Sequence, residues 1–194
     1  MLDRVLSDCC LGHLEPRNYV LPGTVLLVLA VLATPASSQT DHMEQLAASG
    51  QVQDKAPVKA SAEIVIDASP ERVWRLLADI DQWPTWHSAI SAARISGPLE
   101  PGTTFVWANG GPKIKSRIAL VHPSAQLAWT GVTFGGKAIH VWSLGPLPAG
   151  GTLVKTTESI DGFMLRLKLF YSSSDLAKSL NEWLEALKRK AEQS

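Results

Sequence analysis

The chain has 194 residues, of which 45% are hydrophobic and 19% are charged, and its 18 Lys and Arg residues balance 18 Asp and Glu residues. This composition excludes an intrinsically disordered chain, and the length allows one domain with a short appendage. The zero net charge argues against a nucleic-acid partner, because phosphate binding requires a positive surface. The two cysteines, Cys9 and Cys10, are adjacent. They cannot provide a disulfide framework or a four-cysteine zinc site.

Residues 1–38 predict an export signal or an N-terminal anchor rather than part of a folded domain. Residues 25–33 (VLLVLAVLA) form an unbroken apolar run, and small residues follow it up to an expected cleavage position before Gln39. The run is shorter than the roughly 20 apolar residues that span a bilayer. Two basic and three acidic residues precede it, whereas signal peptides are positive there, so an uncleaved membrane anchor is the alternative. We therefore expect a protein that is exported, to the periplasm or the medium, or held at a membrane.

Residues 39–58 are polar and alanine-rich and predict a linker or a loose helix, after which a regular pattern defines one domain over residues 59–194. Alternation over residues 61–67 predicts a half-buried strand, and Ser69-Pro70 is typical of a helix start. Pro84 interrupts that helix and begins a second short turn. Six more strands are expected between turns rich in Gly and Pro, at residues 90–96, 103–108, 114–122, 126–134, 137–144 and 152–160.

A long amphipathic C-terminal helix completes the predicted order. Apolar residues recur at three- and four-residue spacing from Leu169 to Leu187, and Lys188, Arg189 and Lys190 follow at the end, where they complement the helix dipole. The predicted order is therefore a strand, a helix pair, a meander of six strands and a terminal helix.

Several segments resemble one known family. Residues 66–74 (IDASPERVW), followed by Asp79 and by Trp83-Pro84-x-Trp86, resemble the opening of the START-like (SRPBCC) superfamily, in its polyketide cyclase/dehydrase and lipid-transport branch. Residues 102–107 (GTTFVW) and 151–159 (GTLVKTTES) are similar to later segments of that branch, and the resemblance covers about residues 60–190. It implies an α+β helix-grip fold, in which a curved antiparallel sheet of about seven strands wraps around a long C-terminal helix. It also implies a ligand cavity between sheet and helix, without one shared catalytic motif.

The turns predict which side chains face this cavity. With Gly135-Gly136 as a two-residue hairpin loop, one face of the sheet is rich in aromatic side chains and the other is polar and solvated. The predicted cross-strand partners are Trp129 with Trp142, Gly131 with His140, Leu120 with Trp129, Ile118 with Gly131, and His140 with Thr156. The expected ligand-binding residues are Trp86, Phe105, Trp107, Ile118, Trp129, Gly131, His140, Trp142, Thr156, Glu158 and Leu180. The alternative is that these aromatic side chains fill a solid core, with Gly131 marking a bend rather than a gap for a ligand.

His140 and Glu158 are the candidate catalytic pair. In the predicted register they are diagonal cross-strand neighbours with backbones roughly 7–8 Å apart, a distance that their side chains can bridge. Such a pair can supply acid/base chemistry for an aldol cyclisation or a dehydration. The alternatives are that the two groups satisfy each other in the core or orient the polar end of a ligand. The histidines lack metal-ligand spacing and no nucleotide-binding or hydrolase motif occurs, so we expect neither a metal nor a cofactor.

Residues 162–171 (GFMLRLKLFY) mix apolar side chains with Arg166 and Lys168. They predict either a gate that transiently touches a membrane or a helix start that packs on the sheet. The sequence as a whole predicts a protein that binds, and in one version transports, a small apolar ligand such as a lipid or a polyketide-like molecule. Two alternatives stay open: a cyclase- or dehydratase-type enzyme that uses His140 and Glu158, and a non-catalytic interaction module with a filled cavity. The ligand and the oligomeric state are left undefined.

Overall fold

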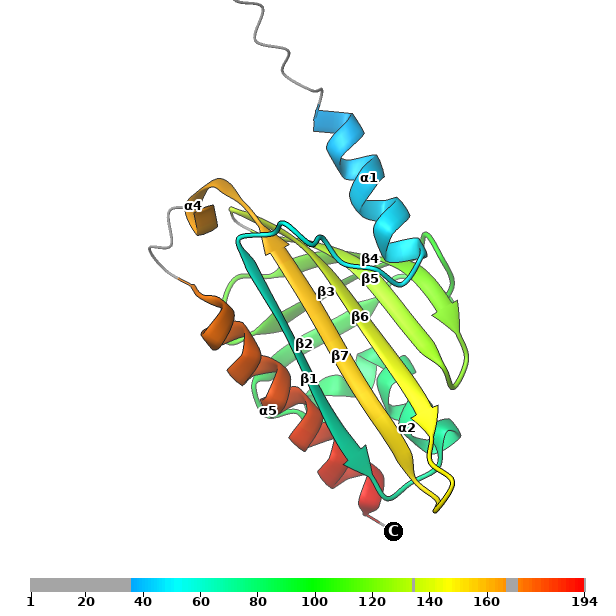
Figure 1. The fold of residues 1–194 in the computed structure, drawn as a ribbon. Helices are drawn as coiled ribbons and strands as arrows, with labels where there is room; N and C mark the ends of the chain where they lie inside the picture. The colour runs from blue at the N-terminus through cyan, green and yellow to red at the C-terminus, as the bar shows by residue number, and fades with distance from the viewer. Residues whose placement is uncertain (1–35, 134, 167–170, 194) are drawn as a thin grey trace, which may run out of the picture. The chain divides into compact units, whose positions relative to one another are not determined.

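The computed structural model describes residues 36–133, 135–166 and 171–193, in which seven antiparallel strands form one curved sheet (Figure 1). The strands are β1 (Val58–Ile66), β2 (Ile90–Ile95), β3 (Thr104–Asn109), β4 (Ile114–His122), β5 (Gln126–Thr133), β6 (Gly136–Pro146) and β7 (Thr152–Asp161). Their spatial order is β1-β7-β6-β5-β4-β3-β2. Strands β2 to β7 therefore form a meander of consecutive hairpins, and the first strand pairs with the last. The predicted helix-grip sheet is confirmed.

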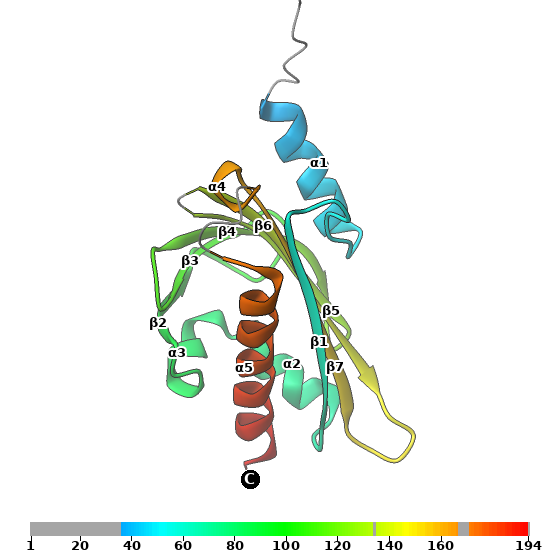
Figure 2. The same ribbon diagram turned by 60° about the vertical axis from the view of Figure 1, so that its left-hand side comes forward.

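Helix α5 (Ser173–Glu192) lies inside the curve of this sheet, with β1 and β7 on one side and β2 and β3 on the other (Figure 2). A capping box fixes its start, because the Ser172 side chain accepts a hydrogen bond from the backbone of Asp175 and the Asp175 carboxylate accepts one from Ser172. A stripe of buried leucines faces the sheet, at Leu176, Leu180, Leu184 and Leu187. The helix begins at Ser173, four residues after Leu169, where the predicted apolar spacing begins. Leu169 itself lies outside the described residues.

A helix pair after β1 closes one end of the space between the sheet and α5. It consists of α2 (Pro70–Ala78), the 3₁₀ turn η1 (Ile80–Gln82) and α3 (Trp83–Trp86). The Ser69 side chain caps α2 by accepting a hydrogen bond from the backbone of Arg72, and Pro70 occupies the first turn, as its residue type predicts. Near the other end lies the short helix α4 (Phe163–Arg166).

Helix α1 (Ala36–Ala48) packs on the outer face of the sheet, in the region predicted as a linker or loose helix. Met43 and Ala47 are buried there against Ala128, Ile139 and Val141. The prediction that the whole outer face is solvated is therefore wrong under α1. The predicted cleavage position before Gln39 falls within this helix, and the export signal or anchor, predicted over residues 1–38, lies almost entirely outside the described residues.

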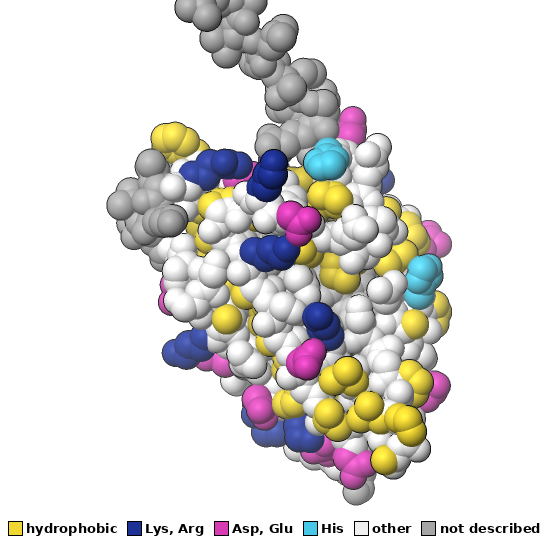
Figure 3. All heavy atoms as spheres, viewed as in Figure 1, with side chains coloured by type: hydrophobic (Ala, Val, Ile, Leu, Met, Phe, Trp, Pro, Cys, Tyr) yellow, Lys and Arg dark blue, Asp and Glu magenta, His cyan; other side chains and the backbone are white. Residues whose placement is uncertain are grey.

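The rest of the outer face is mixed, because charged side chains are interspersed with exposed apolar ones such as Val65, Val132 and Leu153. Figure 3 shows Lys, Arg, Asp and Glu side chains interspersed over the outside of the sheet. None of the helices in the described part of the chain is both long enough and apolar enough to span a membrane.

The strand register differs from the prediction in three hairpins. Gly136 is the first residue of β6 rather than part of the turn, which shifts the β5–β6 pairing by two residues. The observed partners are Trp129 with His140, Gly131 with Ala138, His140 with Glu158, Trp142 with Thr156, Trp129 with Ile118, and Ser116 with Gly131. A shift of two keeps each side chain on its predicted face, because strand periodicity is two. Leu120 is the exception, since a bulge after Ile118 turns it to the outer face beside α1.

Candidate functional site

Trp83 fills the deep part of the space between the sheet and α5. Its side chain is fully buried, and the centroid of its ring lies 5.7 Å from that of Phe105, 5.7 Å from that of Trp129 and 5.1 Å from that of Trp183. The indole Nε1 donates a hydrogen bond of 3.0 Å to the carbonyl oxygen of Leu77. Side chains expected to surround a ligand here instead surround Trp83, so this part of the molecule is a packed aromatic core.

A cavity of about 680 Å³ lies at the other end of the same space, near the start of α5. Its wall comes from the β3–β4 and β5–β6 hairpins, β7, α4 and the first turns of α5. The described residues that line it are Trp107, Asn109, Gly111, Pro112, Ile114, Thr133, Gly135, Gly136, Glu158, Ile160, Leu165, Tyr171, Leu176, Ser179 and Trp183. Of the residues expected to bind ligand, Trp107 and Glu158 are in this wall.

The other expected residues occupy different places. Phe105, Ile118, Trp129 and Trp142 are buried in the main core, and His140 and Thr156 are buried on the same inner face of the sheet. Trp86 packs against Trp183 of α5, and Leu180 of α5 packs with Val58 and Leu176. Gly131 lies opposite Ala138, where a Cβ would come within 3.3 Å of the Ile114 and Ser116 side chains. Its role is to leave room for these two side chains rather than for a ligand above His140.

His140 and Glu158 are directly opposite each other, not diagonal as predicted. The His140 Nδ1 atom lies 3.6 Å from Glu158 Oε2, which is beyond hydrogen-bond distance, while its Nε2 lies 2.7 Å from the Thr156 hydroxyl. The imidazole is 1% exposed and stacks on Trp142, with ring centroids 5.3 Å apart. It does not line the cavity, whereas Glu158 does.

Burial keeps both groups uncharged at neutral pH. It lowers the pKa of His140 to about 3 and raises the pKa of Glu158 to about 8, because each charged form would lose its hydration without gaining a close partner. At pH 7 Glu158 is therefore a protonated carboxyl group that can donate a hydrogen bond. His140 is a neutral ring that does not readily accept a proton.

Three further polar groups reach the cavity. Burial, together with the negative charges that Glu158 and Asp175 carry at high pH, raises the pKa of Tyr171 to about 12, so its phenol is also neutral at pH 7. Asn109 donates a hydrogen bond of 3.5 Å from Nδ2 to Ser179 Oγ across the gap between β3 and α5. These groups can orient the polar end of a ligand. Among the described residues no three His, Cys, Asp or Glu side chains group as metal ligands would.

A comparison with family models identifies the family of this chain. Residues 57–192 match the model described as "Polyketide cyclase / dehydrase and lipid transport". The chain belongs to that family. The resemblance to the START-like superfamily expected from the sequence is thereby confirmed. A comparison with curated proteins finds no match.

Solved structures support the fold of this family member. A hypothetical protein from Helicobacter pylori aligns with a TM-score of 0.63 at 17% identity, covering 71% of this chain and 90% of its own. An aromatase/cyclase from a Streptomyces species aligns at 0.59 and 15% identity, covering 69% and 93%. A START superfamily protein from Mycobacterium smegmatis aligns at 0.56 and 18% identity, covering 70% and 97%. At these identities the comparisons concern the fold alone.

Proposed function

We propose that the protein binds a small apolar ligand, such as a lipid or a polyketide-like molecule, in the cavity between the sheet and α5. The observation that carries this proposal is the cavity itself, a space of about 680 Å³ with a wall formed largely by apolar and aromatic side chains. Pockets for small molecules commonly have this size and character, with a few polar groups that fix orientation. Glu158, Tyr171, Asn109 and Ser179 provide those groups.

The geometry favours binding over acid/base catalysis by the expected pair. Catalysis would require a base that reaches the ligand, whereas His140 is buried against Trp129 and Trp142, does not line the cavity, and has its Nε2 held by Thr156. The low pKa of His140 further opposes proton uptake at neutral pH. The cavity also argues against an interaction module that is filled throughout.

A bulky side chain introduced on the cavity wall is expected to block the ligand. Ser179 faces the cavity from α5, so Ser179→Trp places an indole in the space without removing a core side chain. We expect the affinity for N-phenyl-1-naphthylamine, an uncharged apolar fluorescent probe, to fall by about tenfold or more, since the indole occupies volume the probe needs. Fluorescence titration of the full chain measures the change.

Lys178→Trp is the matched control, because Lys178 is exposed on the neighbouring position of the same helix turn. It should bind the probe like the unaltered chain. Equal binding by the Ser179→Trp variant, or no saturable binding by the unaltered chain, would contradict the proposed function.

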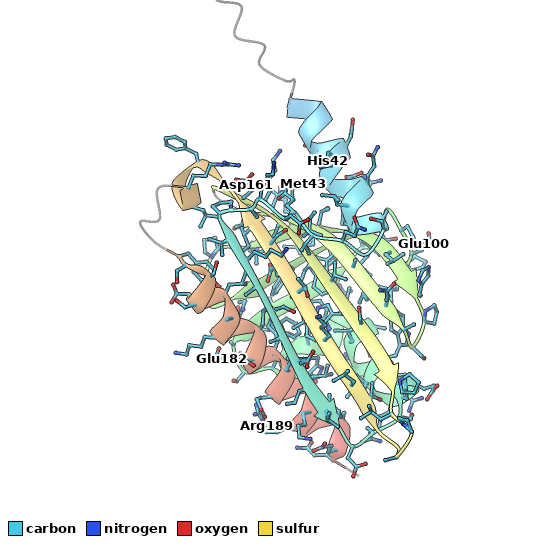
Figure 4. The ribbon with its side chains drawn as sticks, viewed as in Figure 1. His42, Met43, Glu100, Asp161, Glu182 and Arg189 are labelled. Carbon is cyan, nitrogen blue, oxygen red and sulfur yellow. The ribbon has the colours of Figure 1, made fainter. Side chains whose placement is uncertain are left out.

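We also propose that the end of the molecule bearing α4 touches a membrane while ligand exchanges. Phe163 of α4 is 74% exposed, and Leu165 of the same helix lines the cavity. Arg166 pairs at 2.6 Å with Asp161, which Figure 4 labels near α4. Phe163→Ser is expected to weaken binding to vesicles of equal parts phosphatidylcholine and phosphatidylglycerol by about tenfold, since burying a Phe contributes about 1.5 kcal/mol or more. Cosedimentation with the vesicles measures this.

The control is Val65→Ser, which removes another exposed apolar side chain, 51% exposed, from the opposite end of the molecule near the end of β1 (Figure 1). It should leave vesicle binding unchanged. Equal loss in both variants would show that the contact is not specific to α4.

A further inference from the structure

The cavity wall contains an acid but no base. Among the described lining residues there is no Lys, Arg or His, and Glu158 is the only carboxyl group. An anionic ligand, such as a free fatty acid or a phosphate ester, would lose its hydration in this space without meeting a positive charge. Burying a charge without a partner is costly, so the wall disfavours anions.

Among the described residues, the two that lie opposite Glu158 on the neighbouring strands carry no positive charge. Glu158 is on β7, between β6 and β1. Its partner on β6 is His140, a neutral ring that hydrogen-bonds Thr156, and its partner on β1 is Ala60. The lysine next to Ala60, Lys59, pairs with Asp54 at 2.7 Å.

The groups of α5 that act on the cavity residue Tyr171 are acidic, and Lys178, also on α5, is exposed and acts on Asp175. Asp175 and Glu182 act electrostatically on Tyr171, which lines the cavity beside Glu158, and both are acidic. Figure 4 shows Glu182 on α5. These described surroundings disfavour ionisation of Glu158, so its carboxyl group faces the cavity as a hydrogen-bond donor.

We infer that the ligand is an uncharged molecule whose carbonyl oxygen accepts a hydrogen bond from the Glu158 carboxyl group, as a long-chain ketone or ester would. This inference rests on the proposed binding function and defines its chemical class. An apolar chain fits the wall formed by Ile160, Leu165, Leu176 and Trp183, and the carbonyl provides the acceptor that a protonated carboxyl group needs. The cavity would discriminate against ligands that lack an acceptor, because leaving a buried donor unpaired costs more free energy than a matched hydrogen bond contributes.

The test is displacement of N-phenyl-1-naphthylamine from the full chain by three ligands of equal chain length: 2-undecanone, undecanoate and undecylamine. At pH 7 we expect 2-undecanone to compete at a concentration about tenfold lower than undecanoate, because undecanoate, unlike the ketone, would be buried as an unpaired charge. Between pH 7 and pH 9 the ketone affinity should fall about tenfold, since one pH unit above its pKa a group is about nine-tenths ionised.

Glu158→Gln is the matched variant, because its amide keeps the size and a donor but does not ionise. It should bind 2-undecanone with an affinity that does not change from pH 7 to pH 9. Undecanoate or undecylamine binding more tightly than the ketone to the unaltered chain would overturn the inference while leaving the binding function intact. So would the same pH dependence in the variant. Failure of the fluorescent probe to bind would overturn both.

Discussion

Replacing Trp83 with alanine is expected to lower the free energy of unfolding by about 3–5 kcal/mol, the usual cost of removing a large aromatic side chain from a core. The ring lies in edge-to-face contact with Phe105, Trp107 and Trp183, and removing it leaves all three facing a void. The variant also leaves the Leu77 carbonyl oxygen without its indole donor. Chemical denaturation followed by circular dichroism measures the loss.

Trp74→Ala is the control for this prediction, because Trp74 is only partly buried at the edge of the same core. Its loss should be well below that of Trp83→Ala. Trp83→Phe should fall between the two, since the phenyl ring keeps part of the packing but not the hydrogen bond. A change below about 1 kcal/mol for Trp83→Ala, near the centre of ordinary point mutations, would mean that the site collapses without cost.

The fold could be predicted because its signals are local. Alternation, the Ser69-Pro70 helix start and the turn residues between strands define the elements, and most predicted strand boundaries lie within two residues of the observed ones. Register was harder, because two successive glycines allow the turn at either of two positions, and a shift of two changes partners without changing faces. The bulge after Ile118 has no such signal, so Leu120 was assigned to the wrong face.

The site was predicted only in part, for reasons of packing. The concave aromatic face followed from alternation, but the occupant of its deep end, Trp83, comes from α3 and depends on how the helix pair lies against the sheet. The residues that shape the cavity, such as Asn109, Gly136 and Ile160, lie at strand ends and turns that are usually solvent-exposed.

The sequence contains one signal for α1. Ala128, Ile139 and Val141 are apolar residues on the outer face of adjacent strands, and a sheet that is apolar on both faces needs a cover on both.

The stability of the protein is expected to rise with pH in the acid range, to level off, and to fall above about pH 6.5. Between pH 3 and its ordinary pKa of 6.5, His140 binds more proton in the unfolded state, so stability rises with pH. Between its ordinary pKa of 4.5 and its folded value of about 8, Glu158 binds more proton in the folded state, so stability falls with pH. Each slope is at most about 1.4 kcal/mol per pH unit, and the two oppose each other where they overlap.

The plateau should therefore lie between about pH 4.5 and pH 6.5, followed by a loss of about 2 kcal/mol up to pH 8. Glu158→Gln should abolish this loss, because the amide does not titrate, and the rise due to His140 should then extend unopposed to pH 6.5. Urea denaturation midpoints at pH 4, 5.5, 7 and 8.5 measure the profile. Glu63→Gln, on the exposed side of β1, should retain the profile of the unaltered chain. A fall of the same size between pH 6.5 and pH 8 in the Glu158→Gln variant would assign the titration to another group and remove Glu158 as the buried proton donor of the cavity.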